Sequence, residues 1–282
     1  TLACTVPQVV VLQNPHYVGR GRRLAVNRRV RSRVKAGFSH LSMRRADAVI
    51  AISDDLAEQI AAEPRLAPVA VTTVRGVPEP VDVGAPAIEA AAEMVGEGPY
   101  ILSVANDSVQ KRLTDVASIL PLLDRDAREV PRRIVFAGGI SEERRAEMRE
   151  RAGRPDGLVF LGPVADRETV LALFGGAAAA VITSELEAWP LTLHEATSQG
   201  CPLVASDIPP HREVAGVLAR YVPVGDLVGF ASALGDAVTG PRPEPAVNGH
   251  SWSAHGARVV EVLRTVVDRR TDRTVGPATA DP

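Results

Sequence analysis

The sequence predicts an α/β protein built around parallel β-sheets. Along the 282 residues, short runs rich in Val and Ile alternate with helical patterns almost throughout. Such alternation is typical of parallel strands joined by right-handed helical crossovers. Apolar residues make up 45% of the chain and aromatic residues only 4%. The core must therefore consist mainly of Val, Leu, Ala and Ile, a mix that suits sheets buried under helices.

Each expected strand is a short run rich in β-branched residues, and most are followed by a stretch with helical periodicity. The expected strands are residues 8–13, 47–53, 69–74, 100–105, 133–138, 158–162, 179–184 and 202–206. The expected helices are residues 53–63, 111–124, 141–152, 166–175, 190–199, 209–216, 226–238 and 253–268.

One stretch interrupts the alternation. Residues 76–100, "GVPEPVDVGAPAIEAAAEMVGEGPY", hold several prolines and glycines, which favour irregular backbone, so we expect a link between two α/β domains there. Only three strands precede it, which predicts that the first domain is incomplete in this chain. The expected division is a partial first domain over 1–78, a linker over 79–98, a second domain over 99–250, a helix over 251–268 that packs back toward the first domain, and a disordered tail over 269–282.

The charge is distributed unevenly. Residues 1–46 contain no acid, whereas Arg20 to Arg45 carry ten Lys and Arg. Apolar residues at three- and four-residue spacing predict a helix over 20–45. Its basic face is either an ordinary solvated surface or a peripheral contact with anionic lipid headgroups. Nucleic acid is not an expected partner, because no aromatic platform or binding motif accompanies the charge.

The cysteines and the hydropathy bear on the compartment. Cys4 and Cys201 lie far apart and form neither a metal-binding nor a redox spacing, so no disulfide is expected and a reducing cytoplasm is the simplest location. No window reaches the roughly 18 apolar residues that span a bilayer. We expect a cytoplasmic protein, with peripheral attachment to the inner face of the membrane as an option.

Several common motifs are absent from the sequence. It has no Gly-x-Gly-x-x-Gly after a strand, no Walker loop, no Gly-x-Ser-x-Gly and no His-Glu-x-x-His, so dehydrogenase, nucleoside triphosphatase, hydrolase and zinc protease functions lack support. The six histidines are scattered. No metal site built from protein side chains is expected.

The stretch "TSELEAWPLTLHEATSQGCPLVASDIPP", residues 183–210, is the strongest candidate for a binding site. Pro190 suits the first turn of a helix that Gly200 ends. Glu187 then precedes that helix and Glu195 lies one turn inside it. Free backbone N–H groups at the start of a helix attract phosphate, and this end of a parallel sheet is where such folds bind ligands. Amides for a diphosphate and carboxylates for hydroxyl groups together describe a nucleotide-sugar site.

At these residues the sequence resembles the glycosyltransferase family 4 group of retaining enzymes, which have the GT-B fold. The resemblance covers nearly all of residues 47–268, including "RRADAVIAIS", "IVFAGG", "VFLGPV" and the terminal "SW" helix. It implies two Rossmann-like parallel-sheet domains that face each other across a cleft. The family signature stands here as Glu187, Glu195, Ala196, Gly200, Pro202, Ser206 and Asp207, and it continues through "IPPHREV" to Glu213.

The resemblance also implies roles for individual residues. Glu195 would hold the donor ribose and Glu187 the sugar ring, while the backbone around Pro190, Leu191 and Thr192 would meet the diphosphate. Lys111 would stabilise the charge that grows on the leaving diphosphate; otherwise it is an ordinary solvated lysine. Gly139 in "IVFAGG" would line the donor site, and Gly162 to Val164 would lie where backbone atoms recognise the base.

Two departures from the family pattern affect this expectation. Where relatives commonly have Gly-Arg ahead of the lysine, this chain has Ala105 and Asn106, which weakens the grip on the diphosphate unless Arg112 compensates. The segment "EAWPLT" stands where "EGFGLP" is more usual, so the sugar preference is expected to differ.

The acceptor side is represented by "LQNPHYVG", residues 12–19. Gln13, Asn14 and His16 follow a strand of the first domain, so they either orient an acceptor, with His16 assisting proton transfer, or simply form an Asn-Pro turn.

The resemblance implies transfer of a sugar from a UDP-, GDP- or ADP-sugar to a saccharide or lipid-linked acceptor of cell-envelope or polysaccharide synthesis. The configuration of the sugar would be retained, without a metal and without a cofactor. The main alternative is a noncatalytic protein of this fold that binds a nucleotide-sugar or a partner transferase. A sugar-nucleotide epimerase of the same fold would need catalytic acids and a base that we do not identify.

Overall fold

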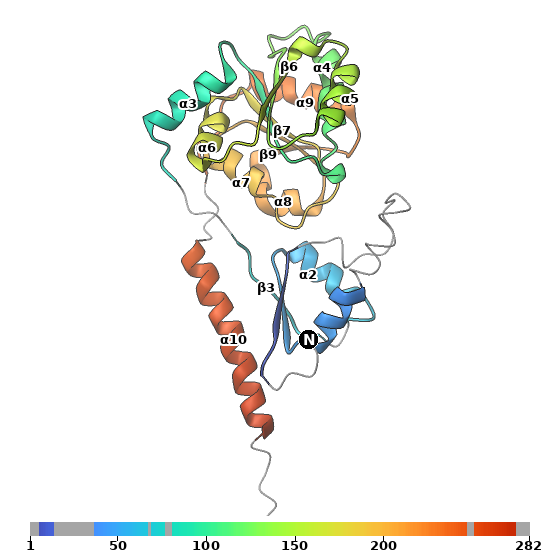
Figure 1. Ribbon diagram of the computed structural model, residues 1–282, viewed down its shortest axis with the longest axis vertical. Coiled ribbons are helices and arrows are strands. Elements are labelled where there is room, and N and C mark those ends of the chain that lie inside the picture. Colours follow the sequence, from blue (N-terminus) through green and yellow to red (C-terminus); the bar gives the residue numbers. More distant parts are fainter. Residues whose placement is uncertain (1–5, 14–36, 67–68, 77–80, 247–250, 275–282) are drawn as a thin grey trace, which may run out of the picture. The chain divides into compact units, whose positions relative to one another are not determined.

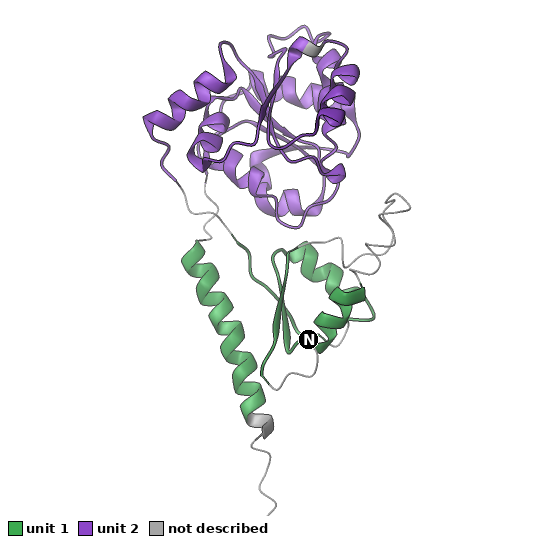
Figure 2. Ribbon diagram, in the orientation of Figure 1, with its two compact units in different colours: residues 1–77, 250–282 green, residues 78–249 purple. Residues whose placement is uncertain are grey.

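The computed structural model describes residues 6–13, 37–66, 69–76, 81–246 and 251–274. The chain folds into two compact units: residues 1–77 together with 250–282 form unit 1, and residues 78–249 form unit 2 (Figure 2). Each unit has its own parallel sheet.

Unit 1 is built on a three-stranded sheet in the order β1-β2-β3, with every pair parallel. Its described elements are β1 (Val9–Leu12), β2 (Ala48–Ala51), α2 (Asp54–Ala61), β3 (Val71–Thr73) and α10 (Trp252–Thr274). Helix α2 begins directly after β2, because the Ser53 side chain accepts a hydrogen bond from the Leu56 backbone N–H at 3.1 Å and so satisfies a free donor of the first turn.

The last helix of the chain belongs to unit 1. Val262 and Val266 of α10 are buried against Ala48, Ile50 and Val74 of the sheet region. Polar contacts fix the same helix at both ends: His255 Nδ1 donates to the Arg75 carbonyl at 3.0 Å, and Arg270 Nε donates to Asp47 Oδ1 at 3.0 Å. The first and last parts of the sequence therefore share one hydrophobic core.

Helix α10 also corrects the expected start of a disordered tail at residue 269. It continues to Thr274, since its last turns gain the contact of Arg270 with Asp47 and a hydrogen bond from Thr271 Oγ1 to the Val267 carbonyl at 3.0 Å. Residues 275–282 lie outside the described residues.

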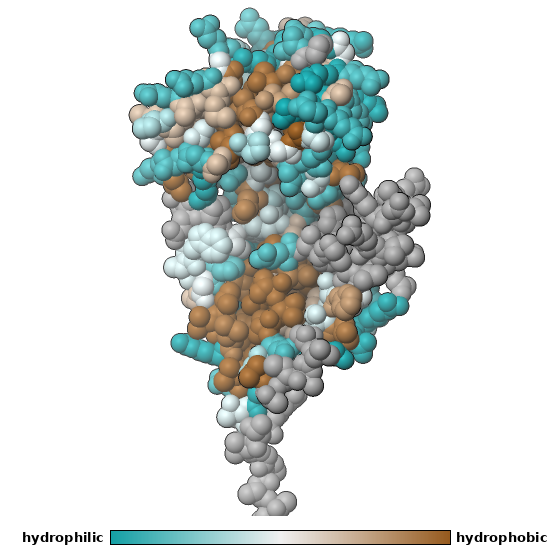
Figure 3. Space-filling view, in the orientation of Figure 1, coloured by the Kyte–Doolittle hydropathy of each residue, from teal (hydrophilic) through white to brown (hydrophobic). Residues whose placement is uncertain are grey.

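The surface of unit 1 carries a broad hydrophobic area (Figure 3). Exposed apolar side chains of this unit include Val11 of β1 and Val260, Leu263 and Val267 of α10. Of the expected basic helix over 20–45, residues 37–45 are helical and the remainder lies outside the described residues. Among the described helices, none combines the length and the hydropathy of a membrane-spanning segment.

Unit 2 is a six-stranded, fully parallel sheet in the order β6-β5-β4-β7-β8-β9, with helices on both faces (Figure 1). Its strands are β4 (Ile101–Val104), β5 (Ile134–Ala137), β6 (Leu158–Gly162), β7 (Ala179–Ile182), β8 (Leu203–Ser206) and β9 (Ala219–Val222). Its α-helices are α3 (Ala85–Val95), α4 (Leu113–Leu123), α5 (Glu142–Ala152), α6 (Arg167–Gly176), α7 (Leu191–Ser198), α8 (Pro209–Ala215) and α9 (Leu227–Thr239). The short helices are η2 (Val109–Lys111), η3 (Pro155–Gly157) and η4 (Gly216–Leu218).

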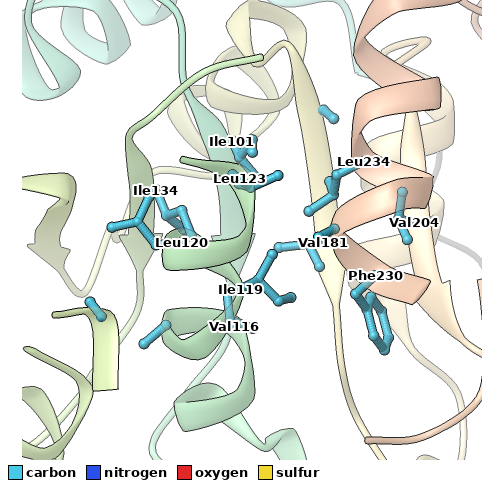
Figure 4. Packing of buried hydrophobic residues seen from close by; sticks show 14 of the residues in the cluster. Ile101, Val116, Ile119, Leu120, Leu123, Ile134, Val181, Val204, Phe230 and Leu234 are labelled. Carbon is cyan, nitrogen blue, oxygen red and sulfur yellow. The ribbon is translucent and has the colours of Figure 1, made fainter. Parts of the chain in front are cut away.

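Two hydrophobic clusters bury the two faces of this sheet. One lies under α4, α5 and α9, and Figure 4 shows side chains of α4 and α9 meeting those of the strands. The other lies under α3, α6, α7 and α8. The strands read as continuous buried apolar runs because both faces are covered.

The strand order places a topological switch between β4 and β7. From β4 the chain adds β5 and β6 on one side of the sheet, and β7, β8 and β9 then follow on the other. Loops that leave the carboxyl ends of such neighbouring strands diverge, which opens the crevice where doubly wound sheets bind ligands. Of the candidate site residues, Lys111 and Thr192 lie at this switch.

The expected linker over 79–98 is wrong for most of its length, because it contains α3. This helix buries Ala87, Ala91 and Val95 in the core of unit 2 and packs on α6. A proline and a glycine of this stretch mark the ends of the helix, with Pro86 in the first turn and Gly96 at the C-cap with a φ of 74°. Proline in the first turn and glycine after the last turn are the usual start and stop of a helix.

Strand β9 is an element that the sequence analysis missed.

Candidate functional site

The site is a hollow at the carboxyl ends of β4 and β7. Its walls come from three segments: the end of β4 with the turn after it, the end of β7, and the first turn of α7. The lining residues are Ser103, Val104, Ala105, Lys111, Leu113, Ile182, Thr183, Ser184 and Thr192.

A glycine contact fixes the loop that follows β4. Gly138, just after β5, has a φ of +137°, and a Cβ atom there would lie 2.0 Å from the Ala105 carbonyl oxygen. Only glycine permits both this conformation and this approach. The Asp107 backbone N–H then donates to the Gly139 carbonyl at 3.0 Å. The role of Gly139 visible in the structure is therefore to hold the β4 loop through its carbonyl.

Asn106 occupies the first turn of this loop. Its side-chain Oδ1 accepts a hydrogen bond from the Ser108 backbone N–H at 3.3 Å. This is a local turn contact of the kind that Asn side chains commonly make. The amide oxygen is thus engaged with the chain's own backbone.

The β4 loop is joined to the loop after β7. Thr183 Oγ1 donates to the Lys111 carbonyl at 2.9 Å and lies 3.2 Å from the Arg112 carbonyl, and the Glu185 N–H donates to the Gln110 carbonyl at 2.9 Å. Arg112 has a φ of 51° and starts α4; it is the only non-glycine residue with positive φ in the described ranges. These bonds fix the backbone from which the Lys111 side chain extends.

The structure brings Lys111 and Glu187 together. Lys111 Nζ lies 2.6 Å from Glu187 Oε1, and the two side chains are only 19% and 12% exposed. Arg112 lies beside them but is held by other carboxylates, since its Nε donates to Asp115 Oδ2 at 2.7 Å and its Nη1 lies 3.3 Å from Glu185 Oε2. The guanidinium is therefore paired within the loop region.

The first turn of α7 contributes Thr192 to the hollow. Pro190 is the N-cap rather than the first helical residue, so its expected position is wrong by one. The Leu193 N–H donates to the Pro190 carbonyl at 3.1 Å, which removes Leu193 from the free amides. Among the described residues, the N–H groups of Leu191 and Thr192 have no backbone acceptor, as expected for the start of a helix.

Glu195 is the fifth residue of α7 and is half-buried. Burial raises the pKa of its carboxyl, and the charge of Arg167 at the start of α6 opposes this only partly. No hydrogen bond to its carboxylate comes from the described part of the chain. Glu195 thus presents a carboxylate that has lost part of its hydration and accepts no hydrogen bond from the described residues.

His211 is a residue of this region that the sequence analysis did not single out. It is fully buried at the start of α8. The charge of Glu187 raises the pKa of its ring and the charge of Lys111 lowers it. Ser184 Oγ, Trp189 Nε1 and His211 Nε2 are buried polar atoms that have no partner among the described residues. His211 belongs to the segment "IPPHREV". A single histidine without a partner at a defined spacing does not predict a position in a site.

The other expected site residues lie in different places. Gly162 ends β6 with a φ of +77° and has open space where a Cβ atom would lie, and Val164 packs against the core that α6 and α7 cover. Gln13 is exposed after β1 in unit 1, while Asn14 and His16 lie outside the described residues. Within the described residues, no group of three or more His, Cys, Asp or Glu is placed to hold a metal ion.

Comparison with known proteins agrees with this architecture. Residues 86–220 match the model of the family described as glycosyl transferases group 1. The α,α-trehalose 6-phosphate synthase from Burkholderia multivorans superposes with a TM-score of 0.73 at 15% identity, over 97% of this chain and 68% of that one. No curated protein sequence gave a significant match.

Two further solved structures have the same architecture. Sucrose-phosphate synthase from Thermosynechococcus elongatus superposes with a TM-score of 0.66 at 15% identity, over 93% of this chain and 68% of that one. The Anabaena protein HepE, solved in complex with UDP and glucose, has a TM-score of 0.64 at 16% identity, over 94% of this chain and 72% of that one. The predicted fold class is confirmed: the chain has the GT-B fold, and its residues 86–220 are similar to the glycosyl transferases group 1 family.

Proposed function

We propose that this protein transfers a sugar from a nucleotide-diphospho-sugar to a saccharide or lipid-linked acceptor, with retention of the anomeric configuration. The observation that carries the proposal is that the Lys111–Glu187 ion pair and the first turn of α7 both lie at the topological switch between β4 and β7. A cation, two free amides and nearby carboxylates are the groups that a diphosphate and the hydroxyls of a sugar require.

The ammonium of Lys111 supplies charge where the reaction needs it. As the bond between the sugar C1 and the diphosphate oxygen breaks, negative charge grows on the leaving oxygen. Lys111 and the amides of Leu191 and Thr192 stabilise that charge better than the charge of the intact donor, which lowers the barrier. The acceptor hydroxyl forms the new bond to C1 on the same face, and its proton passes to the departing diphosphate oxygen.

The two glutamates bind the two ends of the donor. Glu195 accepts hydrogen bonds from the ribose hydroxyls, which compensates a carboxylate that the fold leaves without donors. Glu187 holds Lys111 in place before the donor arrives and then contacts the sugar ring. The proposal includes no metal ion or cofactor; Lys111 and the amides of Leu191 and Thr192 are the donors that it assigns to the diphosphate.

The nucleotide is proposed to be a UDP-, GDP- or ADP-sugar, with its base near Gly162 to Val164. The HepE complex with UDP and glucose supports testing UDP-glucose first. We further propose that the protein acts in the cytoplasm, with peripheral membrane contact through residues 20–45 where the acceptor is lipid-linked.

A noncatalytic donor-binding protein is the second candidate. It is favoured by Asn106, which stands where an arginine is usual and whose amide oxygen is engaged with Ser108. Both candidates predict donor binding, but only the first predicts turnover.

The decisive experiment is calorimetric titration with UDP-glucose, GDP-mannose and ADP-glucose. The wild type is compared with Glu195→Ala and with Glu150→Gln, which alters an exposed carboxylate near the end of α5. We expect one nucleotide class to bind the wild type and the control equally and to bind Glu195→Ala about 10- to 100-fold more weakly, as for the loss of a charged hydrogen bond. Absence of binding by every donor overturns both candidates. Binding without slow hydrolysis or transfer leaves the noncatalytic one.

A further inference from the structure

Ser184 is a buried serine that lines the hollow at the carboxyl ends of β4 and β7. It lies two residues after the end of β7 and is 1% exposed. Its Oγ has no hydrogen-bond partner among the described residues. Most buried hydroxyl groups in proteins are hydrogen-bonded, because an unpaired hydroxyl that has lost its water costs free energy. The exception at the wall of a hollow therefore points to a group that a ligand supplies.

The backbone on both sides of Ser184 is fixed before any ligand binds. Thr183 Oγ1 donates to the Lys111 carbonyl at 2.9 Å, and the Glu185 N–H donates to the Gln110 carbonyl at 2.9 Å. Both acceptors belong to η2, the short helix that follows β4. Ser184 is thus held between two anchored neighbours, and its hydroxyl is preorganised at the hollow.

The side chains that line the hollow favour an anion. Lys111 is a cation, and Ser103, Ser184 and Thr192 carry hydroxyl groups, whereas none of the described residues that line the hollow is acidic. Glu187 approaches only through its contact with the Lys111 ammonium. A serine hydroxyl can donate one hydrogen bond, and an ionised phosphate oxygen only accepts. A phosphate group is therefore the part of the donor that suits Lys111 and Ser184 at the same time.

We infer that Ser184 Oγ donates a hydrogen bond to an oxygen of the donor's diphosphate. This inference rests on the proposed function and adds a side-chain donor that stands beside Lys111. Asn106 brings no charge to the β4 loop, and Arg112 is held by Asp115 and Glu185, so neutral donors carry part of the contact with the diphosphate. The hydrogen bond from Ser184 strengthens as negative charge grows on the leaving group, which stabilises the transition state more than the bound donor.

The test removes the hydroxyl in Ser184→Ala and asks which part of the donor loses affinity. Dissociation constants are measured for uridine, UDP and UDP-glucose, and for the matching guanosine and adenosine ligands. The control is Ser118→Ala. Ser118 lies on α4 outside the lining of the hollow, and its Oγ donates to the Thr114 carbonyl at 2.8 Å.

For the nucleotide class that binds, we expect Ser184→Ala to bind the nucleoside diphosphate about 10- to 100-fold more weakly, as for loss of one hydrogen bond to a charged group. It should bind the nucleoside as the wild type does, and the additional affinity due to the sugar should not change. Ser118→Ala should match the wild type for all three ligands. A loss confined to the nucleotide-sugar overturns the inference, because it assigns Ser184 to the sugar. Equal losses for the nucleoside and the diphosphate, or no loss for either, also overturn it.

The stability of the ligand-free protein is the second measurement, and it separates a contact with the donor from a structural role. Since the Ser184 hydroxyl has no partner among the described residues, its removal should leave the unfolding temperature unchanged or raise it. Added nucleoside diphosphate should then stabilise Ser184→Ala less than the wild type. A variant that is less stable without ligand, or that does not fold, overturns the inference, because the hydroxyl would then have a partner within the protein.

Failure of the inference can be told apart from failure of the proposed function. If the wild type binds a nucleoside diphosphate and Ser184→Ala binds it equally well, the inference fails and the proposed function stands. If the wild type binds no nucleotide, the proposed function fails first and the inference falls with it.

Discussion

Lys111 Nζ lies 2.6 Å from Glu187 Oε1, although 76 positions of sequence separate the two residues. The pair joins the loop after β4 to the loop before α7, at the neighbouring strands β4 and β7 where the strand order switches from one side of the sheet to the other. Lys111 is proposed to contact the leaving diphosphate and Glu187 the sugar ring. In the absence of a donor, the ion pair holds both side chains in place. The pair can be tested from both sides.

Removing the cation should cost both stability and turnover. Lys111→Met leaves Glu187 largely buried without its partner, so the free energy of unfolding should fall by about 1 to 3 kcal/mol. Loss of a donor that stabilises the leaving diphosphate should lower kcat about 100- to 1000-fold. Denaturant unfolding and initial-rate kinetics measure the two effects. Arg125→Met, an exposed change just after α4, should alter neither, and unchanged kcat in Lys111→Met would remove the lysine from the mechanism.

The Glu195 carboxylate should lower the stability of the folded protein, although it is proposed to bind the donor. Since its pKa in the folded protein is raised above the ordinary 4.5, the stability of the wild type should decline as the pH rises from that value through the raised pKa. Glu195→Gln has no charge to bury, so its unfolding temperature should exceed that of the wild type at pH 8 and converge with it below pH 4.5. Thermal unfolding across this pH range checks the sign. A Gln variant that is less stable at pH 8 contradicts the burial argument.

His211 should make the protein sensitive to acid over a defined range. Its pKa is lowered from 6.5 to about 4 on folding, so the unfolded chain takes up the proton first and stability falls as the pH drops from 6.5 toward 4. The shift corresponds to a loss on the order of 3 kcal/mol. Replacement by Asn should remove this part of the pH dependence, which denaturant titrations at a series of pH values would reveal. The same slope in both proteins would assign the acid sensitivity to other groups.

Gly138 should tolerate no side chain. In Gly138→Ala the new Cβ would meet the Ala105 carbonyl oxygen in a left-handed conformation, so the loop that carries Lys111 must shift. We expect a loss of stability of about 3 kcal/mol or more, from strain and collision together. Gly153→Ala is a matched control, because Gly153 also has positive φ but has open space around its Cβ position. It should cost only about 1 to 2 kcal/mol, and equal losses would show that the collision is relieved at no cost.

Most elements of unit 2 could be predicted from the sequence, because short stretches of neighbouring residues determine them. Runs such as "RIVFAG" and "AAVITS" have no strong alternative to buried strands, and helices α5 and α6 carry capping residues, Ser141 and Asp166, at their starts. Helix α3 was missed because a proline in a first turn and a glycine at a C-cap resemble a linker when no partner is known. Strand β9, "ARYV", is too short and mixed to stand out before its pairing with β8 is seen.

The site could be predicted only in part, for a related reason. The residues of the β7–α7 loop follow one another in sequence, so the position of Glu195 relative to the helix start followed from counting. The contact of Lys111 with Glu187 and the burial of His211 depend on which strands are neighbours in the sheet. Strand order is a tertiary property, and no spacing along the chain encodes it.

The return of α10 to unit 1 has a consequence for the way the protein is made. Unit 2 is continuous from residue 78 to 249, whereas unit 1 needs both the first 77 residues and those after 249. The contact of Arg270 with Asp47 spans 223 positions. On the ribosome, the strands of unit 1 therefore emerge before unit 2 and lack α10 until the end, whereas unit 2 has all of its elements as soon as it leaves the exit tunnel. Unit 1, whose strands precede unit 2 in the sequence, is therefore completed only after unit 2.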